Sequence, residues 1–148
     1  MKKILILTVI FLCSLAVTAQ ESRDKIKALK VSFITEKLEL TQIEAQQFWP
    51  IYNDYENVTH KIKFEDLRNI RREIKENVNS LSDKKASELL DKLSKIESKL
   101  YEEEISFNNK LAKVISPKKI LLLKVAEEDF KRKMFDQYKK MKRDNKPN

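Results

Sequence analysis

The sequence predicts an all-α protein built from four helices, two of them very long. Three features support this prediction. The chain contains no glycine, which disfavours the tight hairpins, phosphate-binding loops and nucleophile elbows that need positive φ or close backbone approach. Apolar side chains recur three or four positions apart over long stretches. Hydroxyl residues precede three of these stretches at the position of a helix N-cap.

The first nineteen residues have the pattern of a secretory signal peptide. Two lysines precede an apolar run over residues 4–17, and small residues lead up to Ala19. This run is shorter than the roughly 20 residues that span a bilayer, which favours cleavage after Ala19 over an uncleaved membrane anchor. A lipoprotein is disfavoured because the bulky Leu12 precedes Cys13, where a lipobox has a small residue.

The exported chain is expected to be a soluble periplasmic protein with one helical domain over residues 20–143. Residues 144–148 are expected to form a disordered basic tail. Cleavage removes Cys13, the only cysteine, so no disulfide is expected and the apolar core alone must hold the fold.

The first two helices are predicted from spacing and caps. A helix over about residues 22–38 has apolar residues at helical intervals: Ile26, Leu29, Phe33 and Ile34. Thr41 then has the position of an N-cap, with Glu44 three residues on. This spacing predicts a capping box, and Leu40 before it is placed to act as a hydrophobic staple.

The second helix is expected to reach about Asn77 with two irregularities. Pro50 removes a backbone donor in the third turn and should bend the helix. The step from Ile62 to Leu67 breaks the apolar period, so the buried stripe should rotate around the helix there. One aromatic group is predicted to pack in the core, with client binding as the alternative: Phe48, Trp49, Tyr52 and Tyr55.

The third helix should begin after Ser82, and the fourth after Ser116, with Pro117 at its first position. The third helix has near-heptad apolar positions that continue to Val114: Leu89, Leu93, Ile96, Leu100, Phe107 and Leu111. The fourth helix has one apolar face: Leu122, Ala126, Phe130, Met134, Tyr138 and Met141. Such long helices in a small chain imply an elongated, bent protomer that buries apolar surface by forming a homodimer.

The positive charge is concentrated near the C-terminus. The formal net charge is +8, and residues 117–148 contain 11 basic and 5 acidic residues. Two basic sets are candidate contacts with acidic segments of a client polypeptide, the alternative being solvated helix faces with local ion pairs. The sets are Arg68, Arg71 and Arg72, which are flanked by Glu65, Glu73 and Glu76, and Lys131, Arg132, Lys139 and Lys140. Export disfavours nucleic acid as a partner.

The sequence predicts neither an enzyme nor a metal site. His60 is the only histidine, and with Glu56 it supplies fewer ligands than the three or four that a protein metal site uses. The chain has no second histidine and no glycine-rich loop, and signal-peptide cleavage would remove its only thiol. Catalytic centres are commonly built from such groups. We therefore expect no cofactor.

Two helix starts share a pattern of an aliphatic residue, a hydroxyl cap and a helix: Leu40-Thr41-Gln42-Ile43-Glu44 and Ile115-Ser116-Pro117-Lys118-Lys119. They resemble the paired Leu-Thr-x-x-Gln (LTxxQ) motifs of the Spy/CpxP-type periplasmic chaperones and stress sensors. Glu44 and Lys119 stand where these motifs have glutamine, and Ser116 replaces threonine. Three further runs are similar to the Bacteroidetes branch, often labelled sensor of ECF-type sigma factor: Ala28–Leu38, Glu44–Asn53 and Ala126–Phe130.

This resemblance implies a bent four-helix protomer in an antiparallel, cradle-like dimer. It also implies one of two functions outside the cytoplasm. The first is ATP-independent binding of unfolded or misfolded envelope proteins. The alternative is a soluble regulator that docks on the periplasmic domain of a membrane signalling receptor in an envelope-stress, ECF sigma or metal response.

Overall fold

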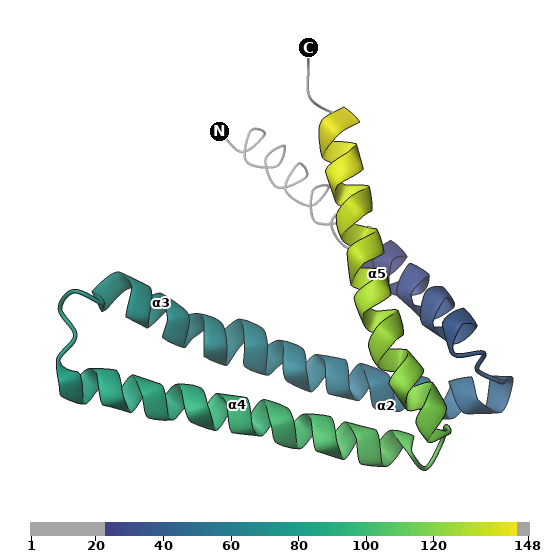
Figure 1. The fold of residues 1–148 in the computed structure, drawn as a ribbon, viewed down its shortest axis with the longest axis horizontal. Helices are drawn as coiled ribbons and strands as arrows, with labels where there is room; N and C mark the ends of the chain where they lie inside the picture. Colours follow the sequence, from purple (N-terminus) through teal and green to yellow (C-terminus); the bar gives the residue numbers. More distant parts are fainter. Residues whose placement is uncertain (1–22, 145–148) are drawn as a thin grey trace, which may run out of the picture. The chain divides into compact units, whose positions relative to one another are not determined.

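The computed structural model describes residues 23–144, and over this range it confirms the all-α fold, with no strand (Figure 1). The expected signal peptide (1–19) and residues 145–148 of the expected tail lie outside the described residues. A first helix covers residues 23–37. The others are the continuous segment α2 (Gln42–Lys61), η1 (Ile62–Leu67) and α3 (Arg68–Asn77), then α4 (Asp83–Leu111) and α5 (Pro117–Asp144). Thus α4 ends before Val114, and the last helix includes Asp144.

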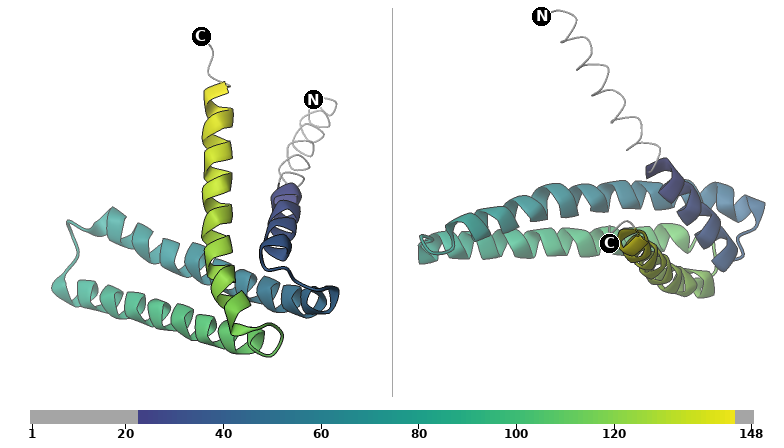
Figure 2. Two further views of the ribbon diagram at one scale, coloured as in Figure 1. Left: turned by 45° about the vertical axis from the view of Figure 1, so that its right-hand side comes forward. Right: turned by 90° about the horizontal axis from the view of Figure 1, so that it is seen from above.

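The described chain divides into two compact units. Among the described residues, one unit comprises 41–120, and the other comprises 23–40 together with 121–144. In the first unit, the continuous helix α2–η1–α3 runs antiparallel to α4 as a long hairpin (Figures 1 and 2). Its buried apolar side chains are Phe48, Tyr52, Ile62, Ile70, Leu89, Phe107, Leu111 and Ile115.

Aromatic stacking joins the two arms of this hairpin. Tyr55 of α2 stacks on Phe107 of α4, with ring centroids 4.1 Å apart and an interplanar angle of 7°. Phe48 and Tyr52 are fully buried, and their rings stack at 5.4 Å. For these residues the predicted core packing is therefore confirmed. α2 continues through Pro50 without interruption, while the bend there stays a prediction.

The break in apolar period becomes a π-helical turn. A regular α-helix turns about 100° per residue. Four residues after Ile62, Asp66 would then lie near the buried stripe. Leu67, five residues after Ile62, would lie about 140° away from it. The π-helical segment η1 spans this interval, from Ile62 to Leu67. Wider winding lets Leu67 follow Ile62 on the packed side, while Asp66 stays exposed. Ile70 is then buried as well.

Glu39 occupies the turn after the first helix in a left-handed backbone conformation. Glu39 has φ of 47°, a left-handed conformation that glycine usually supplies at helix C-termini. The backbone bonds are those of a Schellman motif: Leu40 N–H donates to the Thr35 carbonyl at 3.1 Å, and Glu39 N–H donates to Glu36 at 3.0 Å. Because the chain has no glycine, the turn is made with a strained residue.

The second unit pairs residues 23–40 with the part of α5 from residue 121 onward. Phe33 contacts Phe130 with ring centroids 5.7 Å apart. The buried residues of this unit are Ile34, Leu38, Leu123, Ala126 and Phe130.

The apolar stripes of this unit are longer than the surface that buries them. Ile26 and Leu29 of the first helix are about half exposed, although their spacing predicted a buried face. The predicted face of α5 is likewise divided: Ala126 and Phe130 are buried, whereas Tyr138 and Met141 are exposed. At the start of the predicted α5 face the prediction was wrong, because Leu122 is exposed and its neighbour Leu123 is buried. Periodicity could also not show how far along each stripe another helix packs.

Candidate functional site

The two motif-like helix starts are each capped as the sequence predicted. At the start of α2, the Thr41 hydroxyl accepts from Glu44 N–H at 3.3 Å, and the Glu44 carboxylate accepts from Thr41 N–H at 2.8 Å. This is a complete capping box. At the start of α5, the Ser116 hydroxyl accepts from Lys119 N–H at 3.4 Å, and Pro117 is the first helical residue.

The fold brings these two helix starts into direct contact. The Lys119 ammonium donates to both carboxylate oxygens of Glu44, at 3.0 and 2.8 Å, across 75 residues of sequence. Both side chains are about three-quarters shielded from solvent. The hydrogen bond from Lys119, followed by that from Thr41 N–H, lowers the pKa of Glu44 below its ordinary value.

This ion pair has a positional role. A lysine in the first turn of a helix is disfavoured by the helix dipole, and Glu44 compensates for it at Lys119. The two charges therefore fix the N-terminus of α5 beside that of α2. The sequence analysis did not predict that Glu44 and Lys119 form an ion pair. Their opposite charges at the equivalent position of the two motif-like helix starts could have indicated it.

The predicted arginine set lies on the solvent side of α3, where Arg68, Arg71 and Arg72 are all exposed. Arg72 donates to the Asn69 side chain at 3.1 Å. Glu73, one of the acidic residues expected beside the arginines, instead pairs with Lys85 of α4 at 3.2 Å. The set thus faces solvent on the hairpin.

All four predicted basic residues of α5 are exposed: Lys131, Arg132, Lys139 and Lys140. Lys131 and Arg132 form local ion pairs with Glu128 and Asp129. The Glu128 hydrogen bond raises the pKa of Lys131. Lys139 instead lies over the ring of Phe135, with its Nζ 4.4 Å from the ring centroid. The charges of Lys131 and Arg132 are therefore partly compensated on their own helix.

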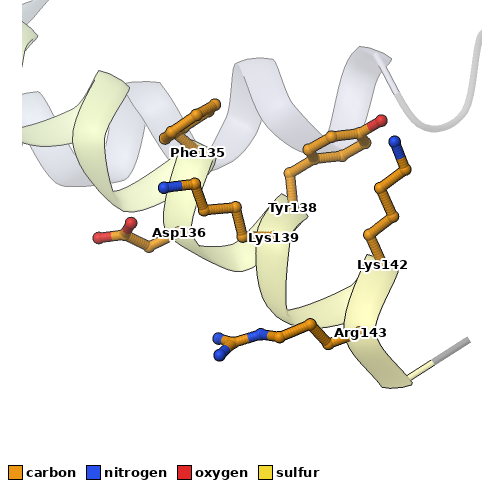
Figure 3. A pocket seen from close by; sticks show the side chains of 6 residues that line it. All are labelled: Phe135, Asp136, Tyr138, Lys139, Lys142 and Arg143. Atoms are coloured by element: carbon orange, nitrogen blue, oxygen red, sulfur yellow. The ribbon is translucent and has the colours of Figure 1, made fainter. Parts of the chain in front are cut away.

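Beyond these pairs, the last turns of α5 combine aromatic rings with basic side chains. A surface pocket there is lined by Phe135, Asp136, Tyr138, Lys139, Lys142 and Arg143 (Figure 3). Phe135 and Tyr138 are each more than half exposed. The Lys142 ammonium lies 5.8 Å from the ring centroid of Tyr138. Sequence reasoning identified Tyr138 only as a core position and did not single out Phe135.

Exposed apolar side chains also lie on the hairpin. On α4 these are Leu90, Tyr101 and Ile105, and on η1 the exposed residue is Phe64. At about 100° per residue, the three α4 residues fall within roughly 60° of one another, about 100° away from the buried side of the helix. They lie on one side of α4, and we call this set of three residues the α4 stripe.

His60 stacks on Phe64 with ring centroids 4.3 Å apart. Among residues 23–144, no three histidine, cysteine or acidic side chains are grouped closely enough to hold a metal ion. No helix within this range is long and apolar enough to cross a bilayer. The absence of a metal site at His60 stays a prediction.

Comparisons of the chain with protein-family models, with curated proteins and with solved structures give no match. The resemblance to Spy/CpxP-type proteins consequently rests on the motif residues alone.

Proposed function

We propose that the protein is an exported, ATP-independent chaperone-like protein that binds unfolded or misfolded envelope proteins. One observation supports this proposal above the others: large apolar side chains are exposed along the helices of both units, interspersed with charged residues. Isolated exposed apolar residues are ordinary, but stripes of them mark surfaces that contact other molecules.

The α4 stripe has the size expected for weak, reversible binding. A client segment covering Leu90, Tyr101 and Ile105 would remove on the order of 200 Å² of apolar surface, worth about 5 kcal/mol at ~25 cal/mol/Å². The ordering of a flexible client offsets much of this gain. Such a surface favours brief contact with many sequences over one tight partner.

The basic residues of α5 supply a second, long-range attraction for acidic clients. Their effect should weaken with salt, because screening acts within about 8–10 Å at physiological ionic strength. Apolar contact should persist when salt is raised.

The test is an aggregation assay with two unrelated denatured clients, without nucleotide, at low and high salt. The chain from Gln20 should suppress aggregation of both clients at equimolar dimer. The triple variant Leu90→Ser, Tyr101→Ser, Ile105→Ser should lose most of this protection at either salt concentration. The charge-neutral control Asp91→Ser, Lys95→Ser, on another side of α4, should retain it.

A second variant tests the electrostatic part, with four charges neutralised to glutamine: Lys131, Arg132, Lys139 and Lys140. Capture should slow at low salt and change little at high salt. If the wild-type chain protects neither client and instead retains a single envelope protein in a pull-down, the chaperone proposal is wrong. The regulator that docks on a membrane receptor would then be the better interpretation.

We further propose that the protein is periplasmic and forms a homodimer. Mass spectrometry of the native protein should find Gln20 as the first residue, and an intact Met1 or a lipid on Cys13 would contradict this. Light scattering should give the mass of a dimer, since the exposed apolar stripes of both units gain from a second copy. A monomer at micromolar concentration would refute the dimer.

A further inference from the structure

The last turns of α5 have a composition unlike the rest of the chain. Residues 131–144 contain seven basic and two acidic residues, whereas residues 20–116 contain 18 of each. Every residue from 135 to 144 is exposed. This end of the helix therefore presents a concentrated positive charge to solvent.

Four of the seven basic side chains of this segment lie on a different side of the helix from its large apolar side chains. At about 100° per residue, four large apolar residues fall within roughly 120°: Met134, Phe135, Tyr138 and Met141. Four basic residues fall within about 100° on another side: Arg132, Lys139, Lys140 and Arg143. Lys131 and Lys142 lie on the apolar side, so the end of α5 is amphipathic only in part. None of its four large apolar residues is buried.

Lysines border the two exposed rings. Lys139 Nζ lies 4.4 Å from the ring centroid of Phe135, and Lys142 Nζ lies 5.8 Å from that of Tyr138. Figure 3 shows both rings on the same side of the helix, with the Lys142 amine beside Tyr138. In this arrangement the lysine ammonium groups themselves lie at the aromatic rings, so positive charge and exposed apolar surface are adjacent.

We propose that this end of α5 docks on an anionic phospholipid surface. A helix with aromatic residues on one side and Lys/Arg on another binds in the plane of a bilayer interface, with its rings between the headgroups and its charges at the phosphates. Docking in this way needs no membrane span, and none is found in the described helices.

The observations favour a lipid surface over an acidic polypeptide. Discrete carboxylates are best recognised by paired arginine forks, but Arg132 already pairs with Asp129, and the remaining charge is mostly lysine. Lysine is a flexible point charge that suits a diffuse anionic surface. Two large exposed rings beside that charge match the interfacial layer of a bilayer, where aromatic residues are enriched.

The experiment measures co-sedimentation of the chain with vesicles. The chain from Gln20 is used because the apolar run at residues 4–17 would itself bind lipid. Vesicles contain either equimolar phosphatidylglycerol and phosphatidylcholine or phosphatidylcholine alone. The chain should sediment with the anionic vesicles only, and rising salt should release it.

Two variants with equal changes in charge locate the surface. The test variant is Lys139→Gln, Lys140→Gln, Lys142→Gln, Arg143→Gln. The control variant on α4 is Lys84→Gln, Lys92→Gln, Lys95→Gln, Lys99→Gln. Each basic residue near an anionic surface contributes about fivefold in partitioning, so the test variant should lose at least about 100-fold. The control should stay within about fivefold, and circular dichroism should show both variants folded.

A third variant tests the apolar contact. Phe135→Ser with Tyr138→Ser keeps every charge and should weaken binding to anionic vesicles by at least about tenfold. Equal binding to both kinds of vesicle, or equal loss in test and control variants, would overturn the proposal. Binding to polyglutamate without binding to anionic vesicles would assign the surface to acidic polypeptides instead. Since the aggregation assay contains no lipid, this inference can fail while the chaperone proposal stands, and the reverse also holds.

Discussion

Deleting Glu65 should convert the π-helical turn η1 into regular α-helix without moving the core. Glu65 is exposed and lies inside the segment Ile62–Leu67. The deletion shortens the step from Ile62 to Leu67 from five residues to four. Four residues of α-helix turn about 400°, which leaves Leu67 only about 40° from Ile62. Ile70 would then follow on the same side, so the packing against α4 should be retained.

The magnitude follows from what each deletion exposes. Removing the exposed Glu65 loses no buried surface, so the free energy of unfolding should change by no more than about 1 kcal/mol. Deleting Lys99 from the middle of α4 is the matched control. It rotates Phe107 and Leu111 by about 100° relative to Leu89. Losing both buried side chains should cost at least about 5 kcal/mol, comparable to the whole stability of a small protein.

Urea denaturation followed by far-ultraviolet circular dichroism measures both effects. The chain without Glu65 should unfold cooperatively near the wild-type midpoint, with equal or higher helical signal. The chain without Lys99 should be largely unfolded. If deletion of Glu65 is as damaging as deletion of Lys99, the π-helical turn does not serve to correct the apolar register, and the reasoning is refuted.

Three further predictions concern single positions. Glu39→Gly should raise the free energy of unfolding by about 0.5–1 kcal/mol, because glycine takes positive φ without strain. The control Glu36→Gly, inside the helix, should lower the free energy of unfolding by about 1 kcal/mol. If the urea midpoints of both variants move in the same direction, this explanation is contradicted. Glu44→Gln keeps the capping box but removes the charge that pairs with Lys119, so it should lower Tm at neutral pH. The folded-state pKa of Glu44 lies below the ordinary 4.5. The higher Tm of the wild type should therefore be present above pH 4.5 and be lost as pH falls through the lowered pKa. A difference in Tm that persists in strong acid would point to another cause. His60→Ala should leave zinc and copper binding unchanged in calorimetry, and loss of a tight stoichiometric site would show that the stacked ring is a ligand.

Local features of the fold could be predicted from sequence because they depend on near neighbours. The capping box of Thr41 and Glu44 and the proline start of α5 are interactions within one helical turn. The irregular step after Ile62 was visible in the apolar spacing, but spacing alone could not show whether the stripe rotates or the helix widens. That outcome depends on α4 packing against the segment, which the sequence does not specify.

The chain by itself determined the helices, their caps and the core positions of Phe48 and Tyr52, because periodicity and hydroxyl caps act over three to five residues. Only the tertiary structure decided which parts of each stripe are covered. Leu123 and Phe130 are buried, whereas Phe135 and Tyr138 on the same helix are exposed. It also decided that Glu44 and Lys119 meet across 75 residues. The physical reason is that burial and long-range ion pairs depend on where other helices lie, and that position is set by the packing of the whole chain.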